Sequence, residues 1–153
     1  MLVTAAIVVL VDQASKAAVR GSIVPGETRS VLPGVQFVNT RNRGIAFGFL
    51  PGSHWAITAL IALALLVLLV YFARHSTRPL IWLPTGMLIG GALGNVLDRI
   101  RAGSVTDFVK LPLGWPPFNL ADAAITIGVL LLVLVIERRR APAASSDNVS
   151  RSP

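Results

Sequence analysis

Four stretches of the chain are apolar enough, and nearly long enough, to form membrane-spanning helices. They run from Met1 to about Val19, from His54 to Ala73, from Leu80 to Leu97 and from Leu120 to Ile136. A helix that crosses a bilayer needs about 20 mostly apolar residues. Since polar segments separate the four stretches, the pattern predicts an integral membrane protein with four transmembrane helices.

A few residues modify these spans. Asp12 and Lys16 interrupt the first span. A cleavable signal peptide is the alternative interpretation of that span, but no basic segment precedes its apolar run. Pro84 in the third span can kink that helix. Small residues recur in the third span at four-residue spacing, at Gly86, Gly90 and Gly94. Such a stripe allows neighbouring helices to approach closely.

Four spans place both chain ends on the same side of the membrane. The connections Arg20–Ser53 and Asp98–Asn119 then share the opposite side. The basic run Glu137–Arg140 after the fourth span is typical of a cytoplasmic anchor, which favours cytoplasmic termini. The segment Ala141–Pro153 has little apolar surface to bury, so we expect a membrane domain over residues 1–140 and a disordered tail over 141–153.

The composition also favours a membrane protein. Hydrophobic residues make up 54% of the 153 residues and charged residues only 14%, and the mean hydropathy is +0.70. The net charge of +7 would suggest nucleic-acid binding in a soluble protein. Here the basic residues lie between the apolar runs and in the tail, where lipid phosphates are the expected partners, so no nucleic-acid partner is predicted. The absence of cysteine excludes disulfides and cysteine nucleophiles.

Four of the seven acidic residues gather at one face of the predicted membrane domain. Asp12 lies late in the first span, Asp98 ends the third, Asp107 lies in the following loop and Asp122 begins the fourth. A carboxylate at the centre of a spanning helix costs about 2.5–3.5 kcal/mol, which makes such residues candidates for function. A purely structural role remains open for some, because Asp12 can pair with Lys16 one turn later.

Asp98 can likewise be held by Arg99 or Arg101, in a local polar group that includes Asn95. The remaining carboxyls suggest acid–base chemistry. Two carboxyls close together share a proton, so that one can activate water while the other protonates the reacting carbonyl group.

Other chemistries fit the sequence less well. His54 and His75 lie at opposite ends of the second span and cannot share a metal ion, and no metal or cofactor is expected. A serine–lysine peptidase using Ser15 or Ser104 is a second alternative, but Ser15 and Lys16 are neighbours that face different sides of a helix. A small transporter or channel subunit is a third alternative. It predicts polar groups through the whole membrane depth, whereas the second span is entirely apolar.

Four sequence motifs together resemble lipoprotein signal peptidase, also called signal peptidase II. They are V-D-Q-A-S-K at 11–16, N-T-R-N-R-G-I-A-F-G-F at 39–49, G-G-A-L-G-N-V-L-D-R-I-R-A-G-S-V-T-D-F at 90–108 and F-N-L-A-D-A-A-I-T-I-G at 118–128. Their order, spacing and placement on the spans all match the family, and together they extend over nearly the whole chain except the tail.

The resemblance implies a bacterial inner-membrane aspartic endopeptidase. Such an enzyme removes the signal peptide from prolipoproteins by cleaving before a diacylglyceryl-modified cysteine. The implied catalytic residues are Asp107 and Asp122. The resemblance also implies a second set of residues, which support this pair or bind substrate and inhibitor. They are Asp12, Lys16, Asn42, Asn95, Asp98, Arg99 and Asn119.

The resemblance also implies a fold, a topology and partners. The fold is four transmembrane helices with a small periplasmic β-cradle, formed around Val31–Phe49, and a short extramembrane helix. Both termini are cytoplasmic and the active site lies near the periplasmic face. The implied partners are prolipoproteins, membrane lipids and globomycin-type inhibitors.

Overall fold

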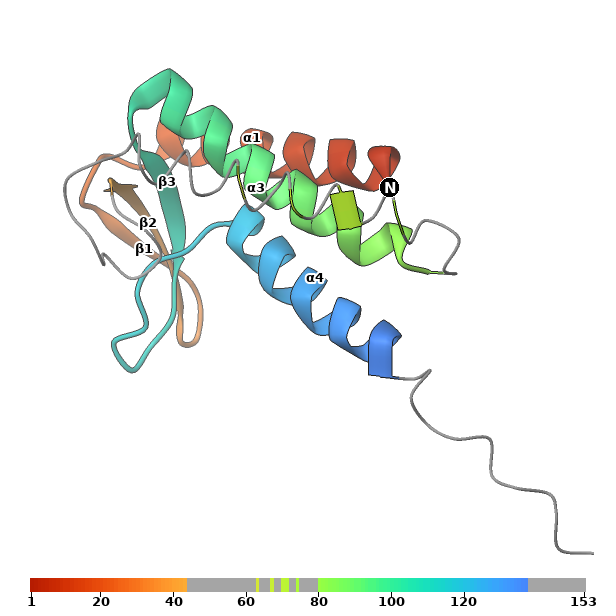
Figure 1. Cartoon of the computed structure of the whole chain (residues 1–153). Helices are drawn as coiled ribbons and strands as arrows, with labels where there is room; N and C mark the ends of the chain where they lie inside the picture. Colours follow the sequence, from red (N-terminus) through yellow and green to blue (C-terminus); the bar gives the residue numbers. More distant parts are fainter. Residues whose placement is uncertain (44–62, 64–66, 68–69, 72–73, 75–79, 138–153) are drawn as a thin grey trace, which may run out of the picture.

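The computed structural model describes residues 1–43, 63, 67, 70–71, 74 and 80–137. The elements it contains are α1 (Leu2–Ser22), β1 (Thr28–Leu32), β2 (Val35–Asn42), α3 (Trp82–Ala102), β3 (Val105–Lys110) and α4 (Leu120–Glu137). Figure 1 shows the three helices running away from a small sheet, with the N-terminus at the far end of α1. The predicted span His54–Ala73 and the predicted tail lie almost entirely outside the described residues.

The outward surfaces of α1 and α4 are apolar. By length and composition α1 is able to cross a membrane, and α4 contains a shorter apolar stretch, Leu120–Val135. The large apolar side chains that these helices expose are Leu2, Val3, Ile7, Leu10, Val11, Ile127, Val129, Leu130, Val133 and Leu134. A continuous apolar surface of this kind fits contact with lipid and not with water.

Glycines allow α3 to pack directly against both other helices. A Cβ atom on Gly86 or Gly90 would lie 2.7 Å from a backbone oxygen of the α1 chain segment, and one on Gly91 would lie 2.5 Å from the carbonyl oxygen of Ala121 in α4. No side chain larger than hydrogen fits at these distances. The close packing expected from the small-residue stripe is thus confirmed, and α3 lies between α1 and α4.

The bounds of α3 differ from the predicted Leu80–Leu97. The helix begins at Trp82, so Pro84 lies in the first turn, where its missing N–H breaks no helical hydrogen bond and no kink is required. It continues one turn beyond the predicted end, to Ala102, because Arg99 and Arg101 suit the last turn of a helix. Gly103 then ends it with φ of 65°, a conformation that glycine adopts without strain.

The sheet is antiparallel with strand order β1–β2–β3. We expected Asp107 on a loop, and this expectation is wrong, because Val105–Lys110 pairs with β2 through partners such as Arg41 with Thr106 and Thr40 with Asp107. Phe108 anchors the sheet on the end of α1 by packing with Val19 and Ile23. Four consecutive residues of β3, from Val105 to Phe108, are buried, so this strand has no water-facing side there.

Candidate active site

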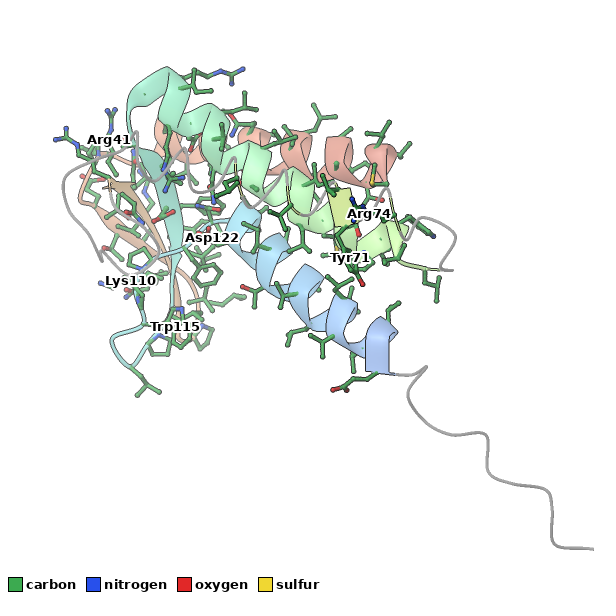
Figure 2. The ribbon with its side chains drawn as sticks, viewed as in Figure 1. Arg41, Tyr71, Arg74, Lys110, Trp115 and Asp122 are labelled. Atoms are coloured by element: carbon green, nitrogen blue, oxygen red, sulfur yellow. The ribbon has the colours of Figure 1, made fainter. Side chains whose placement is uncertain are left out.

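Asp107 and Asp122 line one cavity although they come from different elements. Asp107 lies in the middle of β3 and Asp122 in the first turn of α4. The cavity has a volume of about 470 Å³. Figure 2 places Asp122 where α4 meets the sheet, with Trp115 at the edge of the same region. The structure therefore brings together the two carboxyls that the resemblance implies to be catalytic.

A hairpin-like return of the chain positions the residue that joins these carboxyls. After β3, residues 111–117 form a loop, and Phe118 then pairs with Val109 through two backbone hydrogen bonds of 2.8 and 3.0 Å. This pairing holds Asn119 next to the strand that carries Asp107. Asn119 is completely buried, and it directly precedes α4.

Asn119 contacts both carboxyls at once. Its side-chain amide donates to Asp107 Oδ1 over 2.6 Å. Its side-chain oxygen accepts the backbone N–H of Asp122 at 3.0 Å, while its own backbone N–H donates to Asp122 Oδ2 at 3.2 Å. The reciprocal pair of bonds is a capping box at the start of α4, which fixes the position of Asp122.

Among the described residues, the side chains that donate hydrogen bonds to the carboxylate of Asp107 are amides. Asn42 donates to its Oδ2 over 2.9 Å, opposite the bond from Asn119, and the residue is only 3% exposed. Burial raises the pKa of Asp107 to about 6, and the nearby charge of Asp122 adds to the rise. The hydrogen bonds from Asn42 and Asn119 act in the opposite direction. The group thus changes its protonation state close to neutral pH.

Asp122 is connected to a buried cation through an amide. Asn95 of α3 donates to Asp122 Oδ1 over 2.8 Å. The side-chain oxygen of the same Asn95 accepts Lys16 Nζ at 2.9 Å. Because Lys16 is fully buried, its charge acts over this short path with little screening by water.

The other two aspartates of the cluster form ion pairs with cationic side chains. Asp12 pairs with Lys16 at 2.8 Å, as its spacing predicted, and its second oxygen accepts the backbone N–H of Ala121 at 3.0 Å. Asp98 pairs with Lys16 at 3.2 Å and with Arg20 at 3.7 Å. Arg99 or Arg101 was predicted to hold Asp98. For Arg101 this prediction is wrong, because its guanidinium group donates to Gln13 instead.

Arg99 completes the set of predicted residues. It is 8% exposed, its charge attracts those of Asp122, Asp107 and Asp98, and it donates to the backbone oxygen of Asn95 at 3.3 Å. The structure thus gathers into one cluster all nine residues singled out from the sequence. Ser15 and Ser104 instead donate to nearby backbone oxygens, so they form no pair with Lys16.

Sequence reasoning missed two parts of the site. Gln13 joins α1 to α3 by donating to Asp98 and to the backbone oxygen of Gly94, each at 3.1 Å. The only feature of the sequence that could have indicated a role for Gln13 is its position beside Asp12. The largely apolar wall of the cavity was also missed; it includes Leu111, Trp115, Pro116, Pro117, Phe118, Ala123, Ile125 and Ile127. The proline-rich loop contributes half of this wall, and it was treated only as a connection.

Known proteins resemble this chain over nearly its full length. The family model described as signal peptidase (SPase) II matches residues 4–137. The lipoprotein signal peptidase of Syntrophomonas wolfei is 45% identical over 132 residues, which are 85% of this chain and 88% of that protein. The lipoprotein signal peptidase of Paraburkholderia phymatum is 41% identical over 142 residues, 88% of this chain and 86% of that one.

Solved structures agree with the sequence relatives. A bacterial membrane enzyme solved at 2.3 Å superimposes with a TM-score of 0.86 at 28% identity, covering 97% of this chain and 93% of that one. A second bacterial membrane enzyme, solved at 1.9 Å, gives a TM-score of 0.80 at 30% identity and covers 88% of this chain and 90% of that one. By family model, sequence identity and fold together, this chain belongs to the signal peptidase II family.

Proposed function

We propose that this chain is a membrane endopeptidase that removes the signal peptide from prolipoproteins by cleaving before the diacylglyceryl-modified cysteine, with Asp107 and Asp122 as its catalytic pair. The observation that carries the proposal is that both carboxyls line one cavity and are joined by Asn119. The activity follows from family membership, and the pair supplies a chemistry for it.

The charge distribution suits a pair that shares one proton. The two charges repel each other, which is part of the reason why the pKa of Asp107 is raised to about 6. Interacting carboxyls of this kind lose their protons in two steps that belong to the pair. Between those steps one carboxyl is ionised and the other is protonated, which is the state that peptide hydrolysis requires.

The hydrolysis then proceeds by general acid–base catalysis. The ionised carboxylate takes a proton from a water molecule while the oxygen of that water attacks the scissile carbonyl carbon. The protonated carboxyl donates its proton to the carbonyl oxygen. In the second step the carboxyl that took up the water proton donates it to the nitrogen as the carbon–nitrogen bond breaks. The other carboxylate takes a proton from a hydroxyl group of the tetrahedral intermediate, so the carboxyl product forms and the pair returns to its starting state. The fixed amides of Asn42, Asn95 and Asn119 hold the pair in place for both steps.

The location of the site supports cleavage at a membrane interface. The cavity is lined by residues of the loop after β3 and of α4, the helix with an apolar outward surface. A substrate anchored in the bilayer by its own signal helix and acyl chains would reach it from the membrane. In the described residues the acidic cluster lies at the sheet end of the helices, which suits a site at one face better than an ion path across the membrane.

The remaining features of the proposal concern topology and partners. We place the sheet, as a β-cradle, and the cavity at the periplasmic face of the inner membrane and both termini in the cytoplasm. The remaining transmembrane helix, second in chain order, is assigned to residues 54–73. The membrane domain is assigned to residues 1–140 and a disordered tail to 141–153. Membrane lipids surround the helices, and globomycin-type inhibitors are expected to occupy the cavity.

The test is cleavage of a purified diacylglyceryl-modified prolipoprotein by the purified chain. Asp107→Asn and Asp122→Asn are each expected to lower kcat at least about 10³-fold, because either change removes one half of the acid–base pair. Glu27→Gln is the matched control, since Glu27 is an exposed carboxylate outside the cluster. It should cleave at the wild-type rate.

One further arm makes the test specific. A metal chelator should leave the wild-type rate unchanged, because the pair activates water without a metal ion. Near-normal turnover by either asparagine variant would overturn the catalytic assignment. Absence of cleavage by folded wild-type protein would overturn the activity itself.

A further inference from the structure

A second cavity lies on the other face of β3. Its volume is about 220 Å³, and it is lined by Gln13, Arg20, Arg41, Asp98, Arg101, Ala102, Ser104 and Thr106. Successive strand residues point to opposite faces, so Thr106 faces this cavity while Asp107 faces the first one. The two cavities thus share β3 as a common wall but have no lining residue in common.

Three arginines from three elements converge on this second cavity. Arg20 comes from the end of α1, Arg101 from the end of α3 and Arg41 from β2, where its Cα is the register partner of Thr106. Figure 2 shows Arg41 at the outer side of the sheet. All three are exposed, so that their guanidinium groups are accessible to a ligand from solvent or from the lipid head-group region.

Two of these guanidinium groups are held in position. Arg20 donates to Thr106 Oγ1 at 3.0 Å, and Arg101 donates to Gln13 Oε1 at 3.2 Å. Gln13 is itself fixed, because its amide donates to Asp98 and to the backbone oxygen of Gly94. A fixed guanidinium retains N–H donors for a second partner and loses little side-chain entropy on binding it.

The carboxylate in the cavity wall is already satisfied. Asp98 accepts Lys16 Nζ at 3.2 Å, the backbone N–H of Thr106 at 3.1 Å and the amide of Gln13 at 3.1 Å, with Arg20 at 3.7 Å. It therefore offers little to a cation. The other charged groups of the lining are the three arginines, which favour an anion.

The exposed side chains around the cavity fit the depth at which lipid head groups are found. The exposed large apolar side chains of α1 end at Val11. From Gln13 to Ser22 the helix exposes only small or polar side chains, as expected where a helix leaves the hydrocarbon region. Lys110, also exposed, adds to the positive charge of the sheet.

We propose that this arginine-lined cavity binds a phosphate group, such as the head group of an anionic phospholipid, on the face of β3 opposite the catalytic pair. Guanidinium groups match the geometry of phosphate oxygens and bind them through paired, charge-assisted hydrogen bonds. The site is distinct from the peptidase cavity and its test does not require the peptidase assignment to hold. By tying β2, β3 and the ends of α1 and α3 to one ligand, it would hold the strand that carries Asp107.

The test measures binding to the purified full-length chain in a neutral detergent by isothermal titration calorimetry. The probes are inorganic phosphate, dihexanoyl phosphatidylglycerol and the uncharged dihexanoylglycerol, which lacks a phosphate. Wild-type protein is expected to bind at least one phosphate-bearing probe and to bind it more tightly than dihexanoylglycerol. Binding should weaken as the salt concentration rises.

Variants assign the binding to the cavity. Arg41→Gln and Arg101→Gln should each raise Kd about tenfold, because each removes a charge-assisted hydrogen bond. Arg29→Gln is the control: Arg29 is an exposed arginine of β1 outside the cavity, and its loss changes the net charge equally. It should leave Kd within about twofold. Thermal melting without ligand checks that each variant is folded.

The outcomes separate the sources of phosphate. Binding of phosphatidylglycerol alone identifies a lipid head-group site, while competition by inorganic phosphate identifies a site for free phosphate as well. The proposal is overturned if no phosphate-bearing probe binds more tightly than dihexanoylglycerol. It is equally overturned if Arg29→Gln weakens binding as much as Arg41→Gln does.

Discussion

The carboxyl groups of the cluster are held by two different kinds of partner. Asp12 and Asp98 pair with Lys16 at 2.8 and 3.2 Å. Asp107 and Asp122 receive their close hydrogen bonds from the amides of asparagines. A cation at contact distance offsets the charge of a carboxylate, whereas an amide offers hydrogen bonds without cancelling the charge. At the scale of single residues, this difference separates Asp12 and Asp98 from the pair that we propose to be catalytic.

Asn42 tests this difference directly. Its amide donates to Asp107 and holds the pKa of that carboxyl below the value that burial alone would produce. Asn42→Ala should therefore raise the pKa of Asp107 above about 6. Because the pair titrates together, both limbs of the profile of kcat/KM against pH should move to higher pH.

The matched control is Gln36→Ala, which removes an amide from the other end of the same strand, opposite Lys110. Its pH profile should coincide with that of the wild type. A profile of Asn42→Ala that keeps its two midpoints while only its height falls would mean that Asn42 positions substrate and does not set the pKa.

At the scale of elements, the position of Asp12 depends on a glycine of the neighbouring helix. A Cβ atom on Gly94 of α3 would lie 2.6 Å from Asp12 Oδ2 and 3.2 Å from its Cγ. Asp12 in turn accepts Lys16 and the backbone N–H of Ala121 at the start of α4. Gly94 thus allows one carboxylate to join three helices.

Gly94→Ala is expected to destabilise the protein by about 1–3 kcal/mol, since the added methyl group forces Asp12 or the helices to move. Gly21→Ala in α1 is the control, because nothing lies within 4 Å of its Cβ position. Alanine in place of an unconstrained helical glycine should stabilise by about 0.5–1 kcal/mol. Thermal melting in detergent measures both, and equal melting temperatures for the two variants would contradict the close packing.

The elements also show what the sequence could and could not predict. The helices follow from apolar runs, and the pairing of Asp12 with Lys16 follows from helical spacing. Strand β3 could not be recognised from Val105–Lys110, because a six-residue strand is determined by its partner β2, about 65 residues earlier. The bond from Asn119 to Asp107 depends on that pairing and on the return of the chain at Phe118, so no local pattern reveals it.

At the scale of the whole molecule, the burial of Asp107 makes the stability of the fold depend on pH. Asp107 has a pKa of about 6 in the folded protein and an ordinary value near 3.8 when unfolded. The unfolded chain therefore releases this proton at a lower pH than the folded one does. Stability should fall as the pH rises from about 4 to about 6, and then remain constant with respect to this group.

The size of the effect follows from the shift in pKa. A shift of about two units corresponds to about 3 kcal/mol of free energy lost in all, from well below the unfolded pKa near 3.8 to well above the folded pKa of about 6. Asp107→Asn removes the titrating group while it retains a side chain of the same shape. The free energy of unfolding of this variant, minus that of the wild type, should therefore increase by about 2 kcal/mol between pH 4 and pH 6, the larger part of that total.

The difference between the two proteins is the quantity to measure, because groups that do not interact with Asp107 titrate in the same range and cancel in it. Unfolding curves in detergent at a series of pH values supply it, with Glu27→Gln as the variant whose difference should stay flat. A flat difference for Asp107→Asn as well would mean that the folded protein does not disfavour ionisation of Asp107. An increase of the expected size would mean that the protein loses stability at neutral pH to hold a carboxyl that can exchange protons there. Such a trade between stability and activity is expected if Asp107 is the catalytic group that we propose.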